Sequence, residues 1–313
     1  MPDYISAYTG AEIDAAISLA SSLADGTEPT WWDGEAALAA LPDSRKVFVL
    51  LTDTSVSTVI PMTANYNRAL TSDGKTYTGT SAVTHTWDTM LDKPCIMDGQ
   101  TVYSTRYYIL ICSDVAAQPI AMTFNSNDIL YVIVDGVVIS AGANLSSRRS
   151  LRGMKYLNGG NLRATSFANN SSMRAIPDDT DLTGSGNITG MFNACFGLLW
   201  AKFGAAGSNT MTTWFQNNYS LLGLEIDMQG VGEATSMLNN ALALVHFKPS
   251  NVNCDLNLTV NTQLDKQSLM ATIAALSDRA GQASATLTLG NVHRAKLSPA
   301  DEAVATSKNW VIN

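Results

Sequence analysis

Few residues in this 313-residue sequence have types and spacings that could do chemistry. The segment THTWD (84–88) places His85 and Asp88 close to Trp87. A catalytic histidine needs a nucleophile and an orienting acid, and the surrounding sequence marks neither. The segment PDDTD (177–181) offers several oxygen ligands, but it lacks the spacing and the glycine of an EF-hand calcium loop. We interpret the first segment as structural or part of a loop, and the second as a turn.

Sequence motifs of the common enzyme classes are absent. The chain has no GxSxG, P-loop, HExxH or Rossmann glycine pattern. Its cysteines form no CxxC pair and have no histidine at metal-ligand spacing, so we expect buried free thiols at Cys95, Cys112, Cys195 and Cys254. We therefore expect no enzyme, no catalytic residue, no metal and no cofactor.

The charge balance argues against a nucleic-acid partner. The formal net charge is −8, and charged residues make up only 15% of the chain. Nucleic-acid affinity rests mainly on neutralising phosphates with lysine and arginine. The densest basic stretch is SSRRSLRGMK (146–155), which a solvated strand edge explains at least as well as a phosphate site.

A repeated pattern dominates the second half of the sequence. Leu198, Leu221 and Leu244 are 23 residues apart, and the pattern extends back to Met173 and Leu151. A period of about 20–29 residues with the pattern L-x-x-L-x-L is typical of leucine-rich repeats. One such unit cannot bury its apolar side alone, so neighbouring units must stack into one core.

Strand alternation within each unit predicts which side chains face outward. The first, fourth and sixth positions point inward, and the third and fifth point outward. The third-position column is Gly153, Ala175, Trp200, Gly223 and His246, and the fifth-position column is Lys155, Pro177, Lys202, Glu225 and Lys248.

This exposed strand face is the usual binding surface of a repeat protein. The candidate ligand-binding residues are therefore Trp200, Lys202, Glu225, His246 and Lys248. Trp200 could stack on a sugar ring or contact a neighbouring subunit or domain. The aromatic residues of the return segments are expected in the core: Phe192, Trp214, Phe215 and Tyr219.

The elements that position these residues begin with an expected helix over 8–26. Thr9 and Glu12 can form a capping box, and Gly26 suits the helix end. A narrow apolar stripe leaves the helix marginal alone, so it must pack on its own chain or on copies of itself. The candidate oligomerisation residues are Ile13, Ala16, Ile17, Ala20 and Leu23.

The middle of the chain predicts a linker and then a β-domain. Trp31 and Trp32 lie in a linker over 29–45 that contains one short helix near 34–41. Val-, Ile- and Tyr-rich runs over 46–142 predict a small antiparallel β-domain. Its strongest hairpin signal is the Asp-Gly pair in VDGVV (134–138).

The tail predicts an atypical closing unit. It should contain strands over 254–261 and 285–290, a helix over 265–281 capped by Asp265, and a helix over 298–310 that begins with Ser298 and Pro299. The predicted fold class is mixed and β-rich, with a short N-terminal helix, an antiparallel β-domain and a leucine-rich-repeat-like α/β solenoid with a helical cap. The expected domains are 1–28, 29–45, 46–142 and 143–313, with the cap from 262.

Two stretches resemble known families. The segment YTGAEIDAAI (8–17) is similar to the TG-x-x-I-D-x-A-(I/V) opening of many tail-fibre and appendage proteins of phages that infect gut bacteria. MFNACFGL (191–198) and the closing segment 285–313 resemble the leucine-rich repeats of BspA-like surface proteins. The chain departs from that repeat at Asp178 and Pro249, which stand at inward positions.

The first resemblance implies a virion protein, a tail fibre or receptor-binding appendage, that binds the bacterial host surface. It implies a homotrimer whose N-terminus attaches to other tail or capsid proteins. The expected ligand is a host surface glycan or an outer-membrane protein, with neither nucleic-acid binding nor membrane insertion. The start lacks a signal peptide, which fits a virion made in the host cytoplasm. The alternatives are a bacterial BspA-like adhesin and a capsid-decorating fibre without a receptor role.

Overall fold

The computed structural model describes residues 34–51, 56–87, 94–97, 100–103, 106–112, 128–136, 145–148, 150–157, 167–176, 189–204 and 210–313. Several predictions lie outside these ranges, namely the N-terminal helix with its oligomerisation residues Ile13, Ala16, Ile17, Ala20 and Leu23, the tryptophans of the linker, Asp88 and the PDDTD segment.

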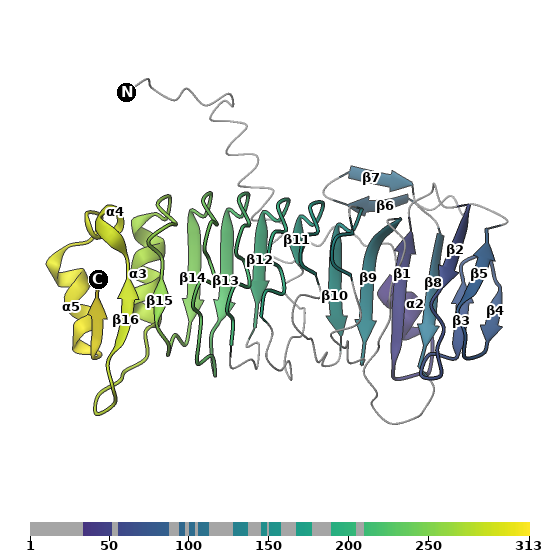
Figure 1. Cartoon of the computed structure of the whole chain (residues 1–313), viewed down its shortest axis with the longest axis horizontal. Helices are drawn as coiled ribbons and strands as arrows, with labels where there is room; N and C mark the ends of the chain where they lie inside the picture. The colour runs from purple at the N-terminus through teal and green to yellow at the C-terminus, as the bar shows by residue number, and fades with distance from the viewer. Residues whose placement is uncertain are drawn as a thin grey trace, which may run out of the picture.

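The strands stand across the long axis of an elongated molecule (Figure 1). A six-stranded sheet lies at one end, in the order β10-β9-β1-β8-β3-β4. Its strands are β1 (Lys46–Leu51), β3 (Arg68–Thr71), β4 (Thr76–Thr78), β8 (Arg106–Ile111), β9 (Ile129–Asp135) and β10 (Gly153–Leu157). Two small antiparallel pairs accompany it, β2 (Ser57–Ile60) with β5 (Val83–Thr86) and β6 (Pro94–Met97) with β7 (Gln100–Tyr103).

Both faces of the central strand β1 are buried. Val47 and Val49 belong to the main core, whereas Phe48 and Leu50 point to a second cluster on the opposite face. Helix α2 (Gly34–Ala39) packs on that second face, close to the predicted short helix. The buried Lys46 ammonium donates to backbone carbonyls at the end of α2, where the helix dipole favours a cation.

The predicted β-domain and the repeat region share one sheet. The pairs β1–β8, β1–β9, β3–β8 and β3–β4 are antiparallel, as predicted, whereas β10 pairs parallel with β9. The predicted boundary at 142/143 therefore falls between two neighbouring strands of the same sheet. The second half of the predicted VDGVV hairpin lies outside the described residues.

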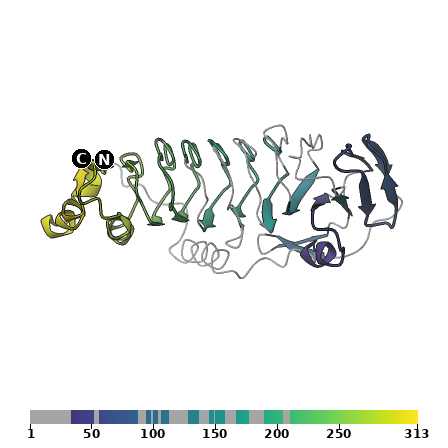
Figure 2. The ribbon, with the colours of Figure 1, turned by 90° about the horizontal axis from the view of Figure 1, so that it is seen from below.

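Successive coils of the chain then stack on one another. Strands β11 (Ala175–Ile176), β12 (Trp200–Phe203), β13 (Gly223–Asp227) and β14 (His246–Ser250) form a parallel sheet in that order. The segments that return to each strand are also joined, because the amides of Phe192 and Phe215 donate to the carbonyls of Trp214 and Met237 at 3.1 and 2.9 Å. We call the described residues between 167 and 250 the coil stack (Figure 2).

The turns of the coil stack repeat the same backbone conformation. Asn169, Ala194, Asn217 and Asn240 occupy equivalent places and have φ angles of 63°, 58°, 63° and 62°. Asparagine tolerates this left-handed region better than other residues with a side chain.

One core runs from the six-stranded sheet to the C-terminus. The expected inward residues Leu198, Leu221 and Leu244 are fully buried, and so are the return-segment residues Phe192, Trp214 and Phe215. The expectation for Tyr219 is wrong, since its side chain is 47% exposed. Tyr219 lies in the turn that leads into β13, where it packs against the equally exposed Phe196 and not toward the core.

Three helices and a three-stranded sheet follow the coil stack, and we call this C-terminal segment the cap. It contains α3 (Lys266–Ala275), α4 (Gly290–Arg294), α5 (Pro299–Ser307) and the parallel strands β15 (Leu256–Asn257), β16 (Ala285–Thr288) and β17 (Trp310–Ile312). The predicted N-caps Asp265 and Ser298 are confirmed, and Ser298 forms a full capping box with Asp301. In the described part of the chain, no helix has the length and apolar character needed to cross a membrane.

Helix α3 covers the open edge of β14. The Ser268 hydroxyl accepts from the Phe247 amide at 3.0 Å, in place of a further strand. The helix ends at Ala275, earlier than the predicted 281, because Leu276 bridges to Val252 and the Ser277 amide donates to the Val252 carbonyl.

Candidate binding face

Strand register brings the five predicted binding residues onto one surface. Trp200, Gly223 and His246 are register partners along one line, and Lys202, Glu225 and Lys248 are partners along the next. Register partners in a sheet have side chains on the same face. We call these six residues the ladder face.

A glycine allows two aromatic rings to meet across the ladder face. The Trp200 indole leans over Gly223, where even a β-carbon would overlap its ring. The indole stacks with the His246 imidazole, with ring centroids 5.2 Å apart and planes inclined by 18°. Gly223 thus lets Trp200 lie over the sheet and contact a strand two positions away.

The charged side chains of the ladder face are arranged around Glu225. One carboxylate oxygen lies 3.5 Å from His246 Nε2, and the other lies 3.8 Å from Lys248 Nζ. These side chains are partly exposed, so their pairing contributes little to stability, about 1 kcal/mol or less. Glu225 and Lys248 remain accessible to a ligand, whereas His246 Nε2 is covered.

Packing alone holds the Trp200 ring. Its Nε1–H is covered, and no residue in the described ranges accepts a hydrogen bond from it. A covered donor without an acceptor is uncommon and unfavourable in proteins. A bound molecule that supplied an acceptor after a small shift of the ring would therefore gain a hydrogen bond.

The ladder face offers chemistry for binding. It combines an aromatic ring, a carboxylate and ammonium groups, which are the groups that contact sugars and protein surfaces. Among the residues that the structure describes, no group of three His, Cys, Asp or Glu side chains could hold a metal ion.

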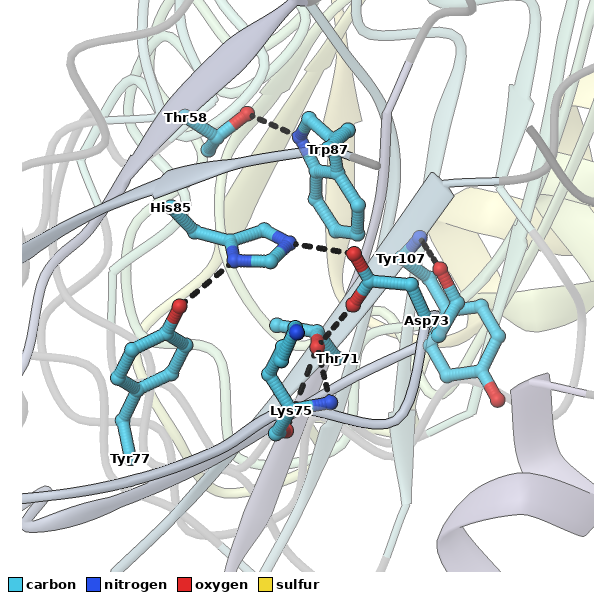
Figure 3. Close-up of polar contacts among 9 residues, drawn as sticks. Thr58, Thr71, Asp73, Lys75, Tyr77, His85, Trp87 and Tyr107 are labelled. Atoms are coloured by element: carbon cyan, nitrogen blue, oxygen red, sulfur yellow. Dashed lines mark hydrogen bonds and ion pairs between the residues drawn. The ribbon is translucent and has the colours of Figure 1, made fainter. Parts of the chain in front are cut away.

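A buried chain of hydrogen bonds joins Asp73, His85 and Tyr77 near the six-stranded sheet, and we call it the relay (Figure 3). His85 Nε2 lies 3.0 Å from Asp73 Oδ2, and His85 Nδ1 lies 2.7 Å from the Tyr77 hydroxyl. The imidazole also meets the Trp87 ring edge to face, with centroids 4.3 Å apart. Sequence reasoning missed Asp73 because this acid lies 12 residues before His85, on the turn between β3 and β4.

The relay is closed to solvent. The side chains of His85 and Asp73 are only 2% and 3% exposed. The relay ties the β3–β4 turn to β5, and Trp87 adds a hydrogen bond from Nε1 to the Thr58 hydroxyl at 3.1 Å. This placement favours the structural role that we expected of His85.

Three cysteines are buried free thiols, as predicted, and the fourth side chain, that of Cys95, lies outside the described set. The Cys195 thiol donates to the Phe167 carbonyl at 3.1 Å. Burial raises the pKa of Cys195 to about 12 and that of Cys254 to about 11. Both thiols are therefore poor nucleophiles.

No protein-family model, no curated protein and no solved structure matches this chain significantly. Its function is therefore inferred from its own residues and their geometry.

Proposed function

We propose that this chain is a structural, adhesive protein of a bacteriophage virion, a tail fibre or receptor-binding appendage. Its C-terminal coils bind the surface of the bacterial host. The observation that carries this proposal is the ladder face, where strand register aligns Trp200, His246 and three charged side chains on neighbouring strands. The protein is proposed to act by adhesion, without catalysis, metal or cofactor.

Within this proposal the coil stack is a leucine-rich-repeat solenoid. Such repeats place asparagine or cysteine at one inward position of each unit. Asn170 fits this role, and Asn261 repeats it just after the coil stack, because each side-chain amide donates to two backbone carbonyls at distances of 2.8–3.1 Å. Cys195 stands at the equivalent position and donates to the Phe167 carbonyl.

The proposed ligand of the ladder face is a host surface glycan, and the alternative ligand is an outer-membrane protein. An aromatic ring packs on the C–H face of a sugar, and Glu225 and Lys248 can bind hydroxyl groups. Nucleic acid is not proposed as a partner, because the chain carries a net charge of −8.

The proposed assembly is a homotrimer. Residues 1–28 would attach the chain to other tail or capsid proteins, or hold three copies together through the apolar stripe of the expected helix. Three weak sites on one stalk would bind a repetitive surface with useful avidity through their effective concentration.

A glycan array tests the ladder face. The full chain should bind at least one bacterial surface glycan, and Trp200→Ala should weaken that binding about tenfold or more. Val304→Ala, which removes an exposed apolar side chain from α5 in the cap, is the control and should bind normally. Unchanged binding by Trp200→Ala would remove the ladder face from the proposal.

Light scattering tests the assembly. The full chain should have three times the chain mass of 33.4 kDa, and a chain beginning at Gly26 should lose this association. A trimer that survives truncation would place the interface in the sheet or the coils. A monomer in both cases would contradict the trimeric fibre and favour a single-chain surface adhesin.

A further inference from the structure

A second exposed surface lies where the return segments enter their strands. Phe196, Tyr219 and Leu242 follow one another at 23-residue intervals and are 45%, 47% and 49% exposed. The rings of Phe196 and Tyr219 stack with centroids 5.8 Å apart and planes inclined by 15°. Three large apolar side chains in one exposed row require an explanation, because exposed apolar residues in folded proteins are usually scattered.

Backbone hydrogen bonds fix this row. The Leu199 amide donates to the Arg174 carbonyl, the Leu222 amide to the Leu199 carbonyl and the Val245 amide to the Leu222 carbonyl, at 2.8, 2.9 and 3.0 Å. Each bond joins one coil to the next, and each donor lies three residues after the exposed residue of its coil. The backbone of the row is therefore preorganised, so a ligand would have to order only the side chains.

The positively charged side chain of Arg174 lies at one end of the row. The exposed Arg174 guanidinium donates from Nη1 to the carbonyl of Gly197, the residue after Phe196, at 3.4 Å. Gly197 is required here, because a β-carbon would overlap the Ser171 carbonyl.

Side-chain amides form a second row, two residues before Tyr219 and Leu242 in the sequence. Asn240 donates to the Asn217 side-chain oxygen at 2.8 Å, and Asn217 donates to that of Asn193 at 3.2 Å. Each amide nitrogen carries a second hydrogen, so the amides can also donate to a ligand. We call Arg174, Phe196, Asn217, Tyr219, Asn240 and Leu242 the arginine–aromatic edge.

We propose that the arginine–aromatic edge binds an acidic glycan. Aromatic rings contact the C–H groups of sugar rings, Arg174 pairs with a carboxylate, and the amides bind hydroxyl groups. A bilayer would use the apolar groups and the cation but not an aligned row of amides. An acidic peptide would pair with the Arg174 guanidinium, but its binding would not require a flat row of aromatic rings. The site lies apart from the ladder face and does not depend on binding there.

Calorimetry with a short oligogalacturonate as probe tests this inference on the full chain. The acidic oligosaccharide should bind, and its methyl ester, which has the same sugar rings without the charge, should bind about tenfold more weakly. Added salt should weaken only the acidic probe. Equal binding of the two probes would overturn the proposal, and tighter binding of poly-L-glutamate would assign the edge to acidic peptides instead.

Matched variants locate the site. Arg174→Gln should weaken oligogalacturonate binding about tenfold, and Tyr219→Ala about fivefold. Lys75→Gln removes an exposed charge from the turn between β3 and β4, outside both surfaces, and should leave this binding unchanged. The ladder face is tested separately by Trp200→Ala on the glycan array, so failure of that proposal and failure of this one are distinguishable. Circular dichroism should confirm that each variant is folded. Normal binding by a folded Arg174→Gln variant, or no binding by the wild-type chain, would overturn the inference.

Discussion

Ala194 and Asn217 adopt the same left-handed backbone conformation one coil apart, with φ angles of 58° and 63°. Asparagine accepts this conformation more readily than alanine, whose β-carbon approaches the following carbonyl. Ala194 therefore holds an unfavourable conformation that the surrounding coils enforce.

Replacing Ala194 with asparagine should stabilise the protein. We expect Ala194→Asn to raise the free energy of unfolding by about 0.5–1 kcal/mol, since it relieves the conformational cost of alanine at positive φ. Urea denaturation measures this change. Asn217→Ala should lower stability by at least as much, because it also removes the side-chain hydrogen bonds to Asn193 and Asn240. A loss of stability in Ala194→Asn would show that crowding around this largely buried residue outweighs the gain.

Gly223→Ala should displace the Trp200 ring, because the added β-carbon overlaps the indole. We expect a loss of about 1–3 kcal/mol in stability and a shift in tryptophan emission, together with loss of ladder-face binding. Gly204→Ala is a matched control, since a β-carbon there meets nothing within 4 Å. Unchanged emission and binding in Gly223→Ala would contradict the described position of Trp200.

His85→Phe should break the buried relay. The substitution leaves the Asp73 carboxylate and the Tyr77 hydroxyl without their shared partner, which should lower the free energy of unfolding by about 2–4 kcal/mol. Tyr77→Phe removes a single hydrogen bond and should lower it by about 1 kcal/mol. Thermal and urea denaturation measure both effects. Equal and small losses in the two variants would argue against a coupled relay.

The cap should lose stability in acid through Asp301. Hydrogen bonds from the Ser298 amide and from Lys266 lower the pKa of this carboxyl to about 2. Because the folded pKa lies below the ordinary value of 3.8, the contribution is present above about pH 4 and is lost as the pH falls through 2. Nuclear magnetic resonance titration should show this pKa directly. In Asp301→Asn the stability of the cap should depend less on pH over this interval, and an ordinary pKa in the wild type would contradict the capping box.

The described thiols should resist alkylation in the folded protein. Burial raises the pKa of Cys195 and Cys254, so little thiolate is present near neutral pH. Mass spectrometry after iodoacetamide treatment should find these two residues modified only after unfolding. Modification of Cys195 in native conditions at the rate of a free thiol would show that the coil stack opens.

The sequence period predicts the strand positions well because each coil buries the same inward positions. The strands β10 to β14 begin at the predicted third position of each unit, from Gly153 to His246. The helix starts at Asp265 and Ser298 were also predictable, since capping is local chemistry. The continuation of the sheet from β9 into β10 was not, because strand pairing between distant segments leaves no local pattern.

The candidate site was predictable only in part. Alternation identified Trp200 and His246 as outward residues, but their contact depends on the absence of a side chain at Gly223. Tyr219 was misassigned because an aromatic residue in an apolar segment is usually buried. The pairing of Asp73 with His85 depends on how the β3–β4 turn folds over β5, which residue types alone do not encode.

The strands lie across the long axis of the molecule, with α3 at the edge of the last strand of the coil stack (Figure 1). Tension applied between the two ends would therefore load the hydrogen bonds between coils one row at a time. Strands pulled apart in this direction separate like a zipper and do not slide past one another under shear. The chain should consequently lengthen under load in small steps, about one coil at a time, and each step would lower the tension between the two ends.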